Sequence, residues 1–325
     1  MTRRATAGLL AVFAFALAGC APVSGTTIPQ VSADVPAPAG AAEVTSPPPA
    51  PVQSCPNLLA SRRPPSPMPA PGQMPAGSTM AKIVQYGKLR VGVDQNTYNV
   101  GFRDPLNGRI QGFDIDMAHA IAKALFGDPD KIELHAITSA QRIPMLQSGE
   151  IDIVVRTMSI TCDRLQQVDF SAVYYDAKQR ILVKTNSAIQ GAADLGGKRV
   201  CATNGSTSLS RIAALAAKPV AIGVPDWTDC LVMLQQGQVD AVSTDDVILA
   251  GMAAQDPYTR VVGDPLADEP YGIAIPQHKE DFVRFVNGVL AEIEADGTWT
   301  AAYQRWLGSL LPGAAPAPPA PQYRD

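Results

Sequence analysis

The stretch KIELHAITSAQRIPMLQSGEIDIVVRTMSITCDR, residues 131–164, carries two apolar runs separated by a short amphipathic segment. Residues 131–137 predict a strand, residues 141–149 a helix that ends at Gly149, and residues 151–155 a buried strand. The second strand is followed by small hydroxyl side chains and then by Arg164. Alternation of strand and helix on this scale is typical of a parallel sheet covered by helices, so the stretch predicts an α/β fold.

The same alternation continues on both sides of this stretch. The other predicted strands are 88–94, 180–185, 198–203, 221–225, 239–245 and 271–276. The other predicted helices are 113–127, 206–217, 228–236, 279–294 and 298–307. The folded part, about residues 80–310, therefore has the length of two lobes of ~100 residues each.

Polar side chains gather at the carboxyl ends of these strands. Ligands of open α/β sheets bind beyond those ends, so the polar residues are expected to converge on one site. The candidates in the first half are Asp94, Gln95, Thr138, Ser139, Arg142, Thr157, Ser159 and Arg164. Those in the second half are Thr203, Gly205, Ser206, Thr207, Asp226, Trp227, Asp245 and Asp246.

Residues 1–19 have the pattern of a secretory signal peptide. Arg3 and Arg4 precede an apolar run, Leu9 to Leu17, that is too short to span a bilayer. The run closes with LAGC at 17–20, a small-residue cleavage site followed by a cysteine, which predicts lipidation of Cys20. The alternative is an ordinary cleaved signal peptide with an unmodified cysteine. The predicted location is the outer face of the cytoplasmic membrane, with the chain anchored through Cys20.

Two segments have a composition that is too poor in large apolar residues to fold by itself. Residues 20–78 contain SPPPAP at 46–51 and RRPPSPMPAPGQMP at 62–75, and residues 312–325 are similar. The first is predicted to be an extended linker and the second a disordered tail. The net charge of −4 and the absence of a basic stripe disfavour nucleic-acid binding.

Four cysteines follow Cys20, namely Cys55, Cys162, Cys201 and Cys230. An even number outside the cytoplasm predicts two disulfides, and neither a CxxC pair nor a histidine cluster supports a metal site. Four cysteines allow three pairings, and two free buried thiols are the alternative. No cofactor is predicted.

Seven segments together resemble one family, the polar amino-acid solute-binding proteins of ABC importers, and within it the binders of glutamate, aspartate and glutamine. They follow one another in order along residues 88–309. The segments are LRVGVD (89–94), GFDIDMAHAIAKAL (112–125), ITSAQRIPMLQSGEIDIVV (137–155), TMSITCDRLQQVDFSAVYYDA (157–177), DLGGKRVCATNGSTS (194–208), LQQGQVDAVSTDDVILAG (234–251) and EPYGIAIP (269–276).

The resemblance implies a two-lobed, periplasmic-binding-protein-like fold of type II with a ligand cleft between the lobes. The first lobe would comprise residues 80–183 and 272–311, and the second lobe residues 184–271. Cys201 and Cys230 then fall in the second lobe, which favours a Cys201–Cys230 bond. The remaining pair, Cys55 and Cys162, would join the linker to the first lobe.

The resemblance also implies roles at the cleft. Arg164 would pair with the ligand's α-carboxylate, which a planar guanidinium matches bidentately. Asp245 would bind the α-ammonium, helped by the Thr157 carbonyl and the Ser159 hydroxyl, and Asp246 is the alternative. A salt bridge within the protein is the other interpretation of Arg164. The full predicted set is Asp94, Ser139, Arg142, Thr157, Ser159, Arg164, Thr203, Ser206, Trp227 and Asp245.

The side-chain end of the cleft departs from the family pattern. Thr97, with Tyr98 beside it, and Ser139 stand where many relatives have aromatic rings. Arg142 and Ser139 resemble the residues that hold a side-chain carboxylate in acid binders, whereas Asp94 resembles an acceptor for an amide in glutamine binders. These residues predict a pocket for Glu, Asp, Gln and Asn that favours the acids. The alternative is that Asp94 and Arg142 neutralise one another.

The resemblance implies a binding protein that closes around its ligand and delivers it to an ABC permease. A sensor subunit that signals to a membrane protein is the alternative, and a dehydratase-like enzyme on the same fold is a remote one. Glu150 and Glu269 are the only glutamates near predicted strand ends, and neither is placed to act as a general acid or base. The chain is therefore predicted not to be an enzyme.

Overall fold

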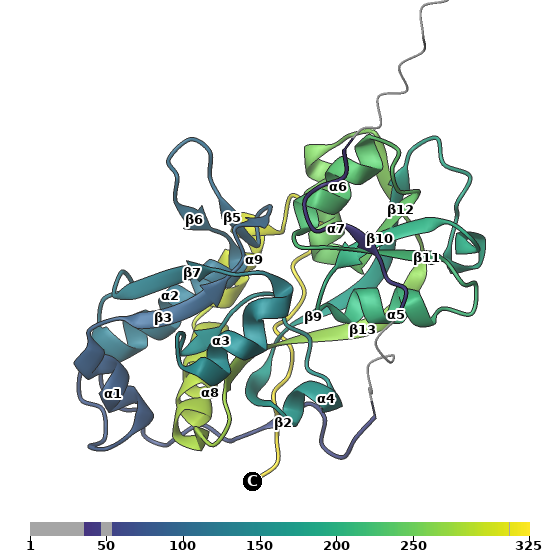
Figure 1. The fold of residues 1–325 in the computed structure, drawn as a ribbon. Helices are drawn as coiled ribbons and strands as arrows, with labels where there is room; N and C mark the ends of the chain where they lie inside the picture. The colour runs from purple at the N-terminus through teal and green to yellow at the C-terminus, as the bar shows by residue number, and fades with distance from the viewer. Residues whose placement is uncertain (1–35, 47–53, 312) are drawn as a thin grey trace, which may run out of the picture. The chain divides into compact units, whose positions relative to one another are not determined.

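The computed structural model describes residues 36–46, 54–311 and 313–325 (Figure 1). Its main sheet has nine strands in the order β1, β11, β10, β12, β9, β13, β8, β3, β7. The two halves of this order correspond to two lobes, each with parallel strands at its centre.

The first lobe contains a parallel group in which β3 lies between β7 and β8. These strands are β3 (Leu89–Val93), β7 (Ile132–Ala136) and β8 (Ile153–Val154). The helices of this lobe are α1 (Thr79–Tyr86), α2 (Phe113–Phe126), α3 (Arg142–Ser148), α4 (Cys162–Leu165), α8 (Glu280–Ala295) and α9 (Thr298–Trp306). A small second sheet is formed by β4 (Asn96–Thr97), β5 (Gly101–Arg103) and β6 (Ile110–Gln111).

The second lobe repeats this plan, with β10 between β11 and β12 and all three parallel. Its strands are β10 (Arg199–Thr203), β11 (Val220–Val224) and β12 (Ala241–Asp245), and its helices are α5 (Thr207–Ala214), α6 (Trp227–Gln235) and α7 (Asp246–Gln255). The alternation predicted from the sequence is therefore present in both lobes, with helix ends that differ by a few residues.

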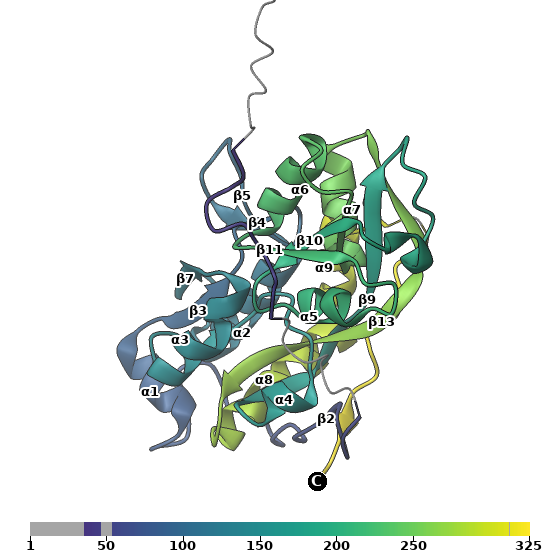
Figure 2. The same cartoon turned by 45° about the vertical axis from the view of Figure 1, so that its right-hand side comes forward.

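Two long strands, β9 (Val168–Lys184) and β13 (Thr259–Pro276), pair with each other and run through both lobes (Figures 1 and 2). The second half of β9 pairs with β12, and the last part of β13 pairs with β8. The predicted strands 180–185 and 271–276 therefore covered only about the last third of β9 and of β13. The rest of each strand was missed because exposed polar residues such as Asp176 and Asp268 interrupt the apolar pattern between the lobes.

Segments predicted to be a free linker and a free tail pack against the folded part instead. β1 (Ala42–Glu43) adds to the edge strand β11, and β2 (Ala60–Ser61) pairs with β14 (Gln322–Tyr323) from the chain's last residues. The Ser61 hydroxyl donates to the Phe170 carbonyl over 2.8 Å. Composition predicts only whether a segment can fold by itself. These residues instead pair with strand edges and pack on surfaces that the folded lobes provide.

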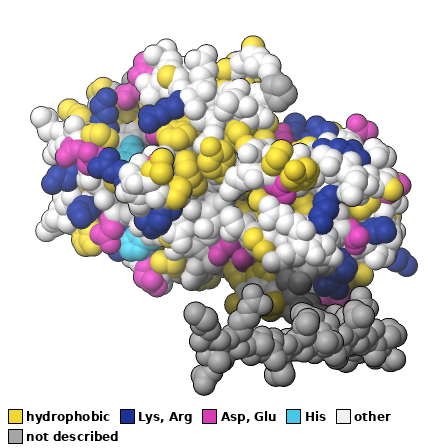
Figure 3. Space-filling view, turned by 90° about the horizontal axis from the view of Figure 1, so that it is seen from above, with side chains coloured by type: hydrophobic (Ala, Val, Ile, Leu, Met, Phe, Trp, Pro, Cys, Tyr) yellow, Lys and Arg dark blue, Asp and Glu magenta, His cyan; other side chains and the backbone are white. Residues whose placement is uncertain are grey.

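Both disulfides in the structure join the cysteines that the sequence analysis pairs. Cys201 is bonded to Cys230 inside the second lobe, and Cys55 is bonded to Cys162 at the start of α4. The predicted signal peptide and residues 20–35 and 47–53 of the linker, Cys20 included, lie outside the described residues. Within the described part, no helix is both long and apolar enough to cross a membrane. Figure 3 shows basic and acidic side chains interspersed around apolar ones on one face.

Candidate functional site

A small polar cavity lies at the carboxyl ends of the parallel strands of both lobes. Its free volume is about 10 Å³, room for about one water molecule and far below the ~300–1,000 Å³ of pockets for drug-sized ligands. Of the predicted ligand-binding residues, all except Asp94 and Thr203 line it. Thr207, one of the polar candidates at the strand ends, lines it as well, and so do Ser208 and Ile248, which the sequence analysis did not name. The lining is Ser139, Arg142, Thr157, Ser159, Arg164, Ser206, Thr207, Ser208, Trp227, Asp245 and Ile248.

Arg164 lies in α4, a single turn whose amino end is capped by the Thr161 hydroxyl, which accepts from the Arg164 backbone N–H. Its side chain is buried, with Nη1 donating to the Ser159 carbonyl over 2.7 Å and Nη2 to the Gly205 carbonyl over 3.2 Å. Burial lowers the pKa of Arg164, while Glu269 and Asp245 raise it. These hydrogen bonds go to neutral carbonyls, and no carboxylate of the described residues forms an ion pair with the guanidinium.

Arg142, at the start of α3, points into the same cavity. Its Nε donates to the Ser139 carbonyl over 2.9 Å, and its Nη2 donates to the Gly205 carbonyl over 3.1 Å. Burial is the main reason that the pKa of Arg142 lies well below its usual value, and the positive charges of Arg164 and Arg156 lower it further. The site therefore concentrates positive charge against one wall.

Gly205, whose carbonyl both arginines contact, belongs to the loop between β10 and α5 of the second lobe. Its backbone is left-handed, with φ of 76°, and a Cβ atom there would lie 2.8 Å from the Ala140 Cα of the first lobe. Glycine is required by both the torsion angle and this close approach. The two lobes therefore meet at this loop.

Asp245 ends β12 on the opposite side of the cavity, at the amino end of α7. Its Oδ2 accepts from the Tyr271 hydroxyl over 2.6 Å, whereas Oδ1 is buried and has no hydrogen-bond partner among the described residues. Burial raises the pKa of Asp245 well above its usual value, and the nearby Glu269 raises it further. A carboxylate with one unsatisfied oxygen facing a cavity is a ready acceptor for a cation. Asp246 does not line the cavity, and its carboxylate caps the Val247 N–H of its own helix.

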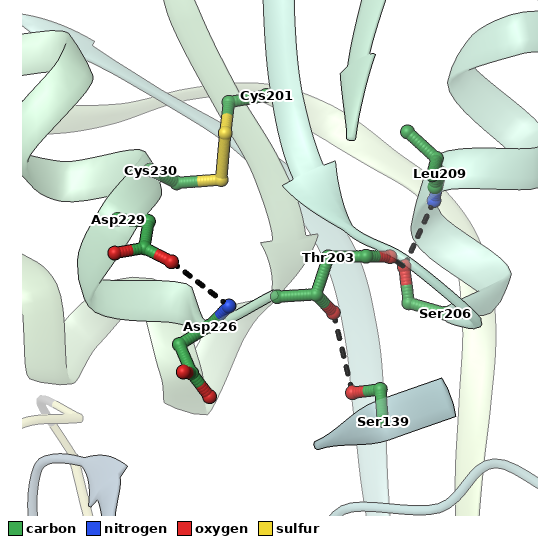
Figure 4. The surroundings of a disulfide bond; sticks show 8 residues. All are labelled: Ser139, Cys201, Thr203, Ser206, Leu209, Asp226, Asp229 and Cys230. Carbon is green, nitrogen blue, oxygen red and sulfur yellow. Dashed lines mark hydrogen bonds between the residues drawn. A yellow bond between two sulfur atoms is a disulfide. The ribbon is translucent and has the colours of Figure 1, made fainter. Parts of the chain in front are cut away.

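The hydroxyl groups of the second-lobe wall are fixed by the start of α5. Ser206 caps the helix by accepting from the Leu209 N–H over 3.0 Å (Figure 4). The Thr207 hydroxyl donates to Glu269, which is buried in β13 and paired with Arg211 at 3.2 Å. Sequence reasoning set Glu269 aside, yet it orients a residue that lines the cavity.

Trp227, at the start of α6, supplies a flat apolar face beside Ile248. Its indole Nε1 is buried and has no hydrogen-bond partner among the described residues. Buried indole N–H groups usually find an acceptor, so this donor is available to a bound molecule.

Asp94 does not occupy the position that the sequence analysis gave it. It lies behind the cavity wall and pairs with Arg156, whose Nη2 is 3.0 Å from Asp94 Oδ2. The alternative pairing with Arg142 is not formed, because the Arg142 side chain turns toward Ser139 and Gly205. Arg156 was missed although it lies in the quoted stretch, and its signal is a charged residue directly after a buried strand.

Thr203 also lies behind the wall, where its hydroxyl donates to the Ser139 hydroxyl over 3.2 Å (Figure 4). This hydrogen bond joins β10 of the second lobe to the first lobe. Figure 4 also shows the Cys201–Cys230 bond, which ties β10 to α6 near the site. Thr203 therefore contributes through Ser139 rather than by direct contact with the cavity.

Thr157 lines the cavity in a strained conformation, with φ of 39°. Its backbone N–H donates to Asp114 Oδ2 over 2.9 Å, and the Tyr174 hydroxyl donates to Asp114 Oδ1 over 2.8 Å. Complete burial raises the pKa of Asp114 to about 7, despite these hydrogen bonds. Asp114 thus holds the strained loop that carries Thr157 and Ser159.

The site offers donors, acceptors and charges, but no metal-binding group. Among residues 36–46, 54–311 and 313–325, no cluster of three or more His, Cys, Asp or Glu side chains could hold a metal ion. The arrangement presents charges of both signs, which can bind a small molecule that carries both an anion and a cation.

Known proteins resemble the chain over this same region. The glutamine-binding protein GlnH of an ABC transporter in Bacillus subtilis (strain 168) is 40% identical over 230 residues, which are 70% of this chain and 84% of that protein. The glutamate-binding protein GluB of Corynebacterium glutamicum is 30% identical over 254 residues, 73% of this chain and 84% of that protein.

A solved structure has the same fold. An ancestral arginine-binding protein bound to glutamine superposes with a TM-score of 0.64 and 37% identity, covering 68% of this chain and 98% of that one. Residues 89–309 also match the model of the bacterial extracellular solute-binding proteins, family 3. The chain therefore belongs to this family and has its periplasmic-binding-protein-like α/β fold.

Proposed function

We propose that the protein is an extracytoplasmic, lipid-anchored binding protein for L-glutamate, L-aspartate, L-glutamine and L-asparagine, which delivers them to an ABC importer by lobe closure. One observation carries the proposal. Two guanidinium groups bound only to carbonyls face one side of the cavity, and a carboxylate with an unpaired oxygen faces the other. A zwitterion satisfies both sides at once.

Arg164 would bind the α-carboxylate of the ligand. A buried guanidinium that contacts carbonyls gains a charge-assisted, bidentate partner when a carboxylate enters. Trp227 Nε1 lacks a partner in the described structure and is a further donor in the same cavity. The electrostatic attraction between the Arg164 guanidinium and the ligand's α-carboxylate is strong because both charges are withdrawn from water.

Asp245 would bind the α-ammonium through its unpaired Oδ1. Burial raises the pKa of the Asp245 carboxyl, and the ligand's ammonium would lower it again. Binding of the ligand would therefore favour the charged form of Asp245. The Ser159 hydroxyl and the Thr157 carbonyl face the same space and provide neutral acceptors.

Arg142 would bind the polar end of the ligand side chain. The two arginines and Asp245 are the charged groups that line the cavity in the described part of the chain, which leaves one positive charge after the α-groups are paired. A side-chain carboxylate compensates that charge, and a side-chain amide oxygen can only accept from it. Relatives named for glutamine and for glutamate accord with this ligand set.

Lobe closure would couple binding to transport. Arg142 and Arg164 belong to the first lobe, whereas Asp245 belongs to the second, and β9 and β13 are the strands that pass between the lobes. A ligand that bridges both walls favours the closed state because it gains contacts there that the open state lacks. The permease would then recognise the closed form.

Isothermal titration calorimetry tests the proposal on the chain from Ala21 onward. The four amino acids are expected to bind, whereas glutarate, which lacks the ammonium, and 4-aminobutanoate, which lacks the α-carboxylate, are not. Arg164→Ala should abolish binding of all four, and Arg142→Ala should weaken the acids most. Arg109→Ala, at an exposed position away from the cavity, is the matched control. Intact binding by Arg164→Ala would contradict the proposal.

Cellular experiments test the anchor and the partner. Cells that express the full chain are expected to attach labelled fatty acid to the wild type but not to Cys20→Ser. Uptake of labelled L-glutamate should fall when the gene is deleted and should be restored by the wild type but not by Arg164→Ala. Normal uptake in the deleted strain would argue against import and favour a sensor subunit.

A further inference from the structure

Arg156 is a third buried arginine at the site, and the proposed function does not use it. Its side chain is 0% exposed and lies behind the cavity wall rather than in it. The parallel pairing of β3 with β8 places Gly92 beside Val154, and Asp94 and Arg156 each follow two residues later. The fold therefore brings these two charges together at neighbouring strand ends.

Both carboxylate oxygens of Asp94 are engaged within the protein. Its Oδ1 accepts from the backbone N–H groups of Gln95 over 2.7 Å and of Asn96 over 2.9 Å. Its Oδ2 accepts from the Thr97 hydroxyl over 2.8 Å and lies 3.0 Å from Arg156 Nη2. The negative charge of Asp94 is thus neutralised beside the cavity.

Arg156 also forms a hydrogen bond with Ser139, which lines the cavity. The guanidinium Nη1 donates to the Ser139 hydroxyl over 2.6 Å, and the Thr203 hydroxyl donates to the same oxygen over 3.2 Å. A hydroxyl has two lone pairs and one proton, so Ser139 can offer the cavity only its proton. Arg142 beside it carries donors alone. The side chains of Ser139 and Arg142 therefore present donors and no acceptor to the cavity.

We propose that Arg156 is a positioning residue for ligand selection. By neutralising Asp94 and occupying one lone pair of Ser139, while Thr203 occupies the other, it leaves the side chains of Ser139 and Arg142 with donors only and selects a side-chain carboxylate over a side-chain amide. A carboxylate presents only acceptors, whereas the NH₂ group of an amide would be buried against donors. The inference rests on the proposed function and names its preferred ligands, L-glutamate and L-aspartate.

The preference is measured as the ratio of dissociation constants of L-glutamine and L-glutamate, by calorimetry on the chain from Ala21 onward. The wild type should favour glutamate by ~10-fold or more, the value of one lost buried hydrogen bond. Arg156→Met leaves Asp94 charged and frees a lone pair on Ser139, so the ratio should fall ~10-fold. Asp94→Asn should keep or raise the ratio, because Arg156 then adds uncompensated positive charge.

The double variant Asp94→Asn, Arg156→Met removes both charges together and is the variant expected to fold if Arg156→Met does not. Its ratio should lie between those of the wild type and Arg156→Met, because Ser139 can then accept from an amide. A ratio equal to that of the wild type in every folded Arg156 variant would overturn the inference. That is the result of a purely structural role, which would weaken all ligands by one factor.

The failure of this inference and that of the proposed function give different results. If the wild type binds amides as tightly as acids and Arg164→Ala still loses both, only the role of Arg156 is wrong. If the wild type binds none of the four amino acids, the proposed function itself is wrong. Arg109→Met is the control for loss of an arginine elsewhere and should leave the ratio unchanged.

Discussion

Arg142 and Arg164 donate to one and the same acceptor, the carbonyl oxygen of Gly205, over 3.1 and 3.2 Å. A carbonyl carries only a partial negative charge, so it holds the two guanidinium groups in place without neutralising them. The backbone of the second lobe thus stands where the first lobe concentrates its positive charge. An entering carboxylate would compensate that charge while the lobes stay in contact.

Gly205→Ala should weaken the binding of all four amino acids by ~10-fold or more, since a left-handed alanine costs ~1–2 kcal/mol and its Cβ would collide with Ala140. Gly237→Ala is the matched control, because Gly237 has φ of 74° and its added Cβ would meet only Lys184 Nζ at 3.9 Å. Calorimetry measures affinity, and small-angle scattering measures closure. If both substitutions weaken amino-acid binding equally, the contact between Gly205 and Ala140 is unimportant for binding.

Asp245→Asn should separate stability from function. Removing a buried carboxylate with an unpaired oxygen is expected to leave the ligand-free protein as stable or more stable by ~1 kcal/mol, because the desolvation cost disappears. Amino-acid affinity should fall ~100-fold, since the ammonium loses its anion. Thermal unfolding and calorimetry on the same preparation test both effects. Loss of stability together with retained binding would contradict the assignment.

Asp114 should make stability depend on pH. Its folded-state pKa of about 7 exceeds the ~3.9 of an unfolded aspartate, so the folded state holds the proton more tightly. The stabilisation is complete below pH ~3.9 and is lost as the pH rises toward about 7, by roughly 4 kcal/mol. Denaturant unfolding of the wild type and Asp114→Asn between pH 4 and 7 measures this. Parallel stability curves would show that Asp114 has an ordinary pKa.

Gly288→Ala tests whether the amino-terminal segment packs on the first lobe. Alanine normally stabilises a helix by ~1 kcal/mol relative to glycine, but a Cβ at Gly288 in α8 would collide with the Met68 side chain. Because the Met68 side chain can shift, the substitution should loosen this contact and make residues 54–78 moderately more sensitive to added protease. Met68→Ala combined with Gly288→Ala should restore protection. If Gly288→Ala alone is as resistant as the wild type, Met68 does not pack there.

Local patterns in the sequence were sufficient for the α/β class, and they predicted residues that the structure brings together at one cavity. Strand and helix periods depend on neighbouring residues, and the carboxyl ends of parallel strands meet wherever such strands pair. For this reason Arg142, Arg164 and Asp245 were proposed from their places after strands. The segments that resemble the family were also sufficient for membership, which the match to the family model confirms.

Tertiary structure alone decided which charges pair and which segments dock. Asp94 and Arg156 are far apart in sequence, and only the register of β3 against β8 brings them together, so Arg142 stays free for the cavity. The docking of β1 and β2 likewise depends on edges that exist only once the lobes have folded. Sequence patterns report a residue's own secondary structure, whereas electrostatic pairing depends on packing between distant strands, which no local pattern encodes.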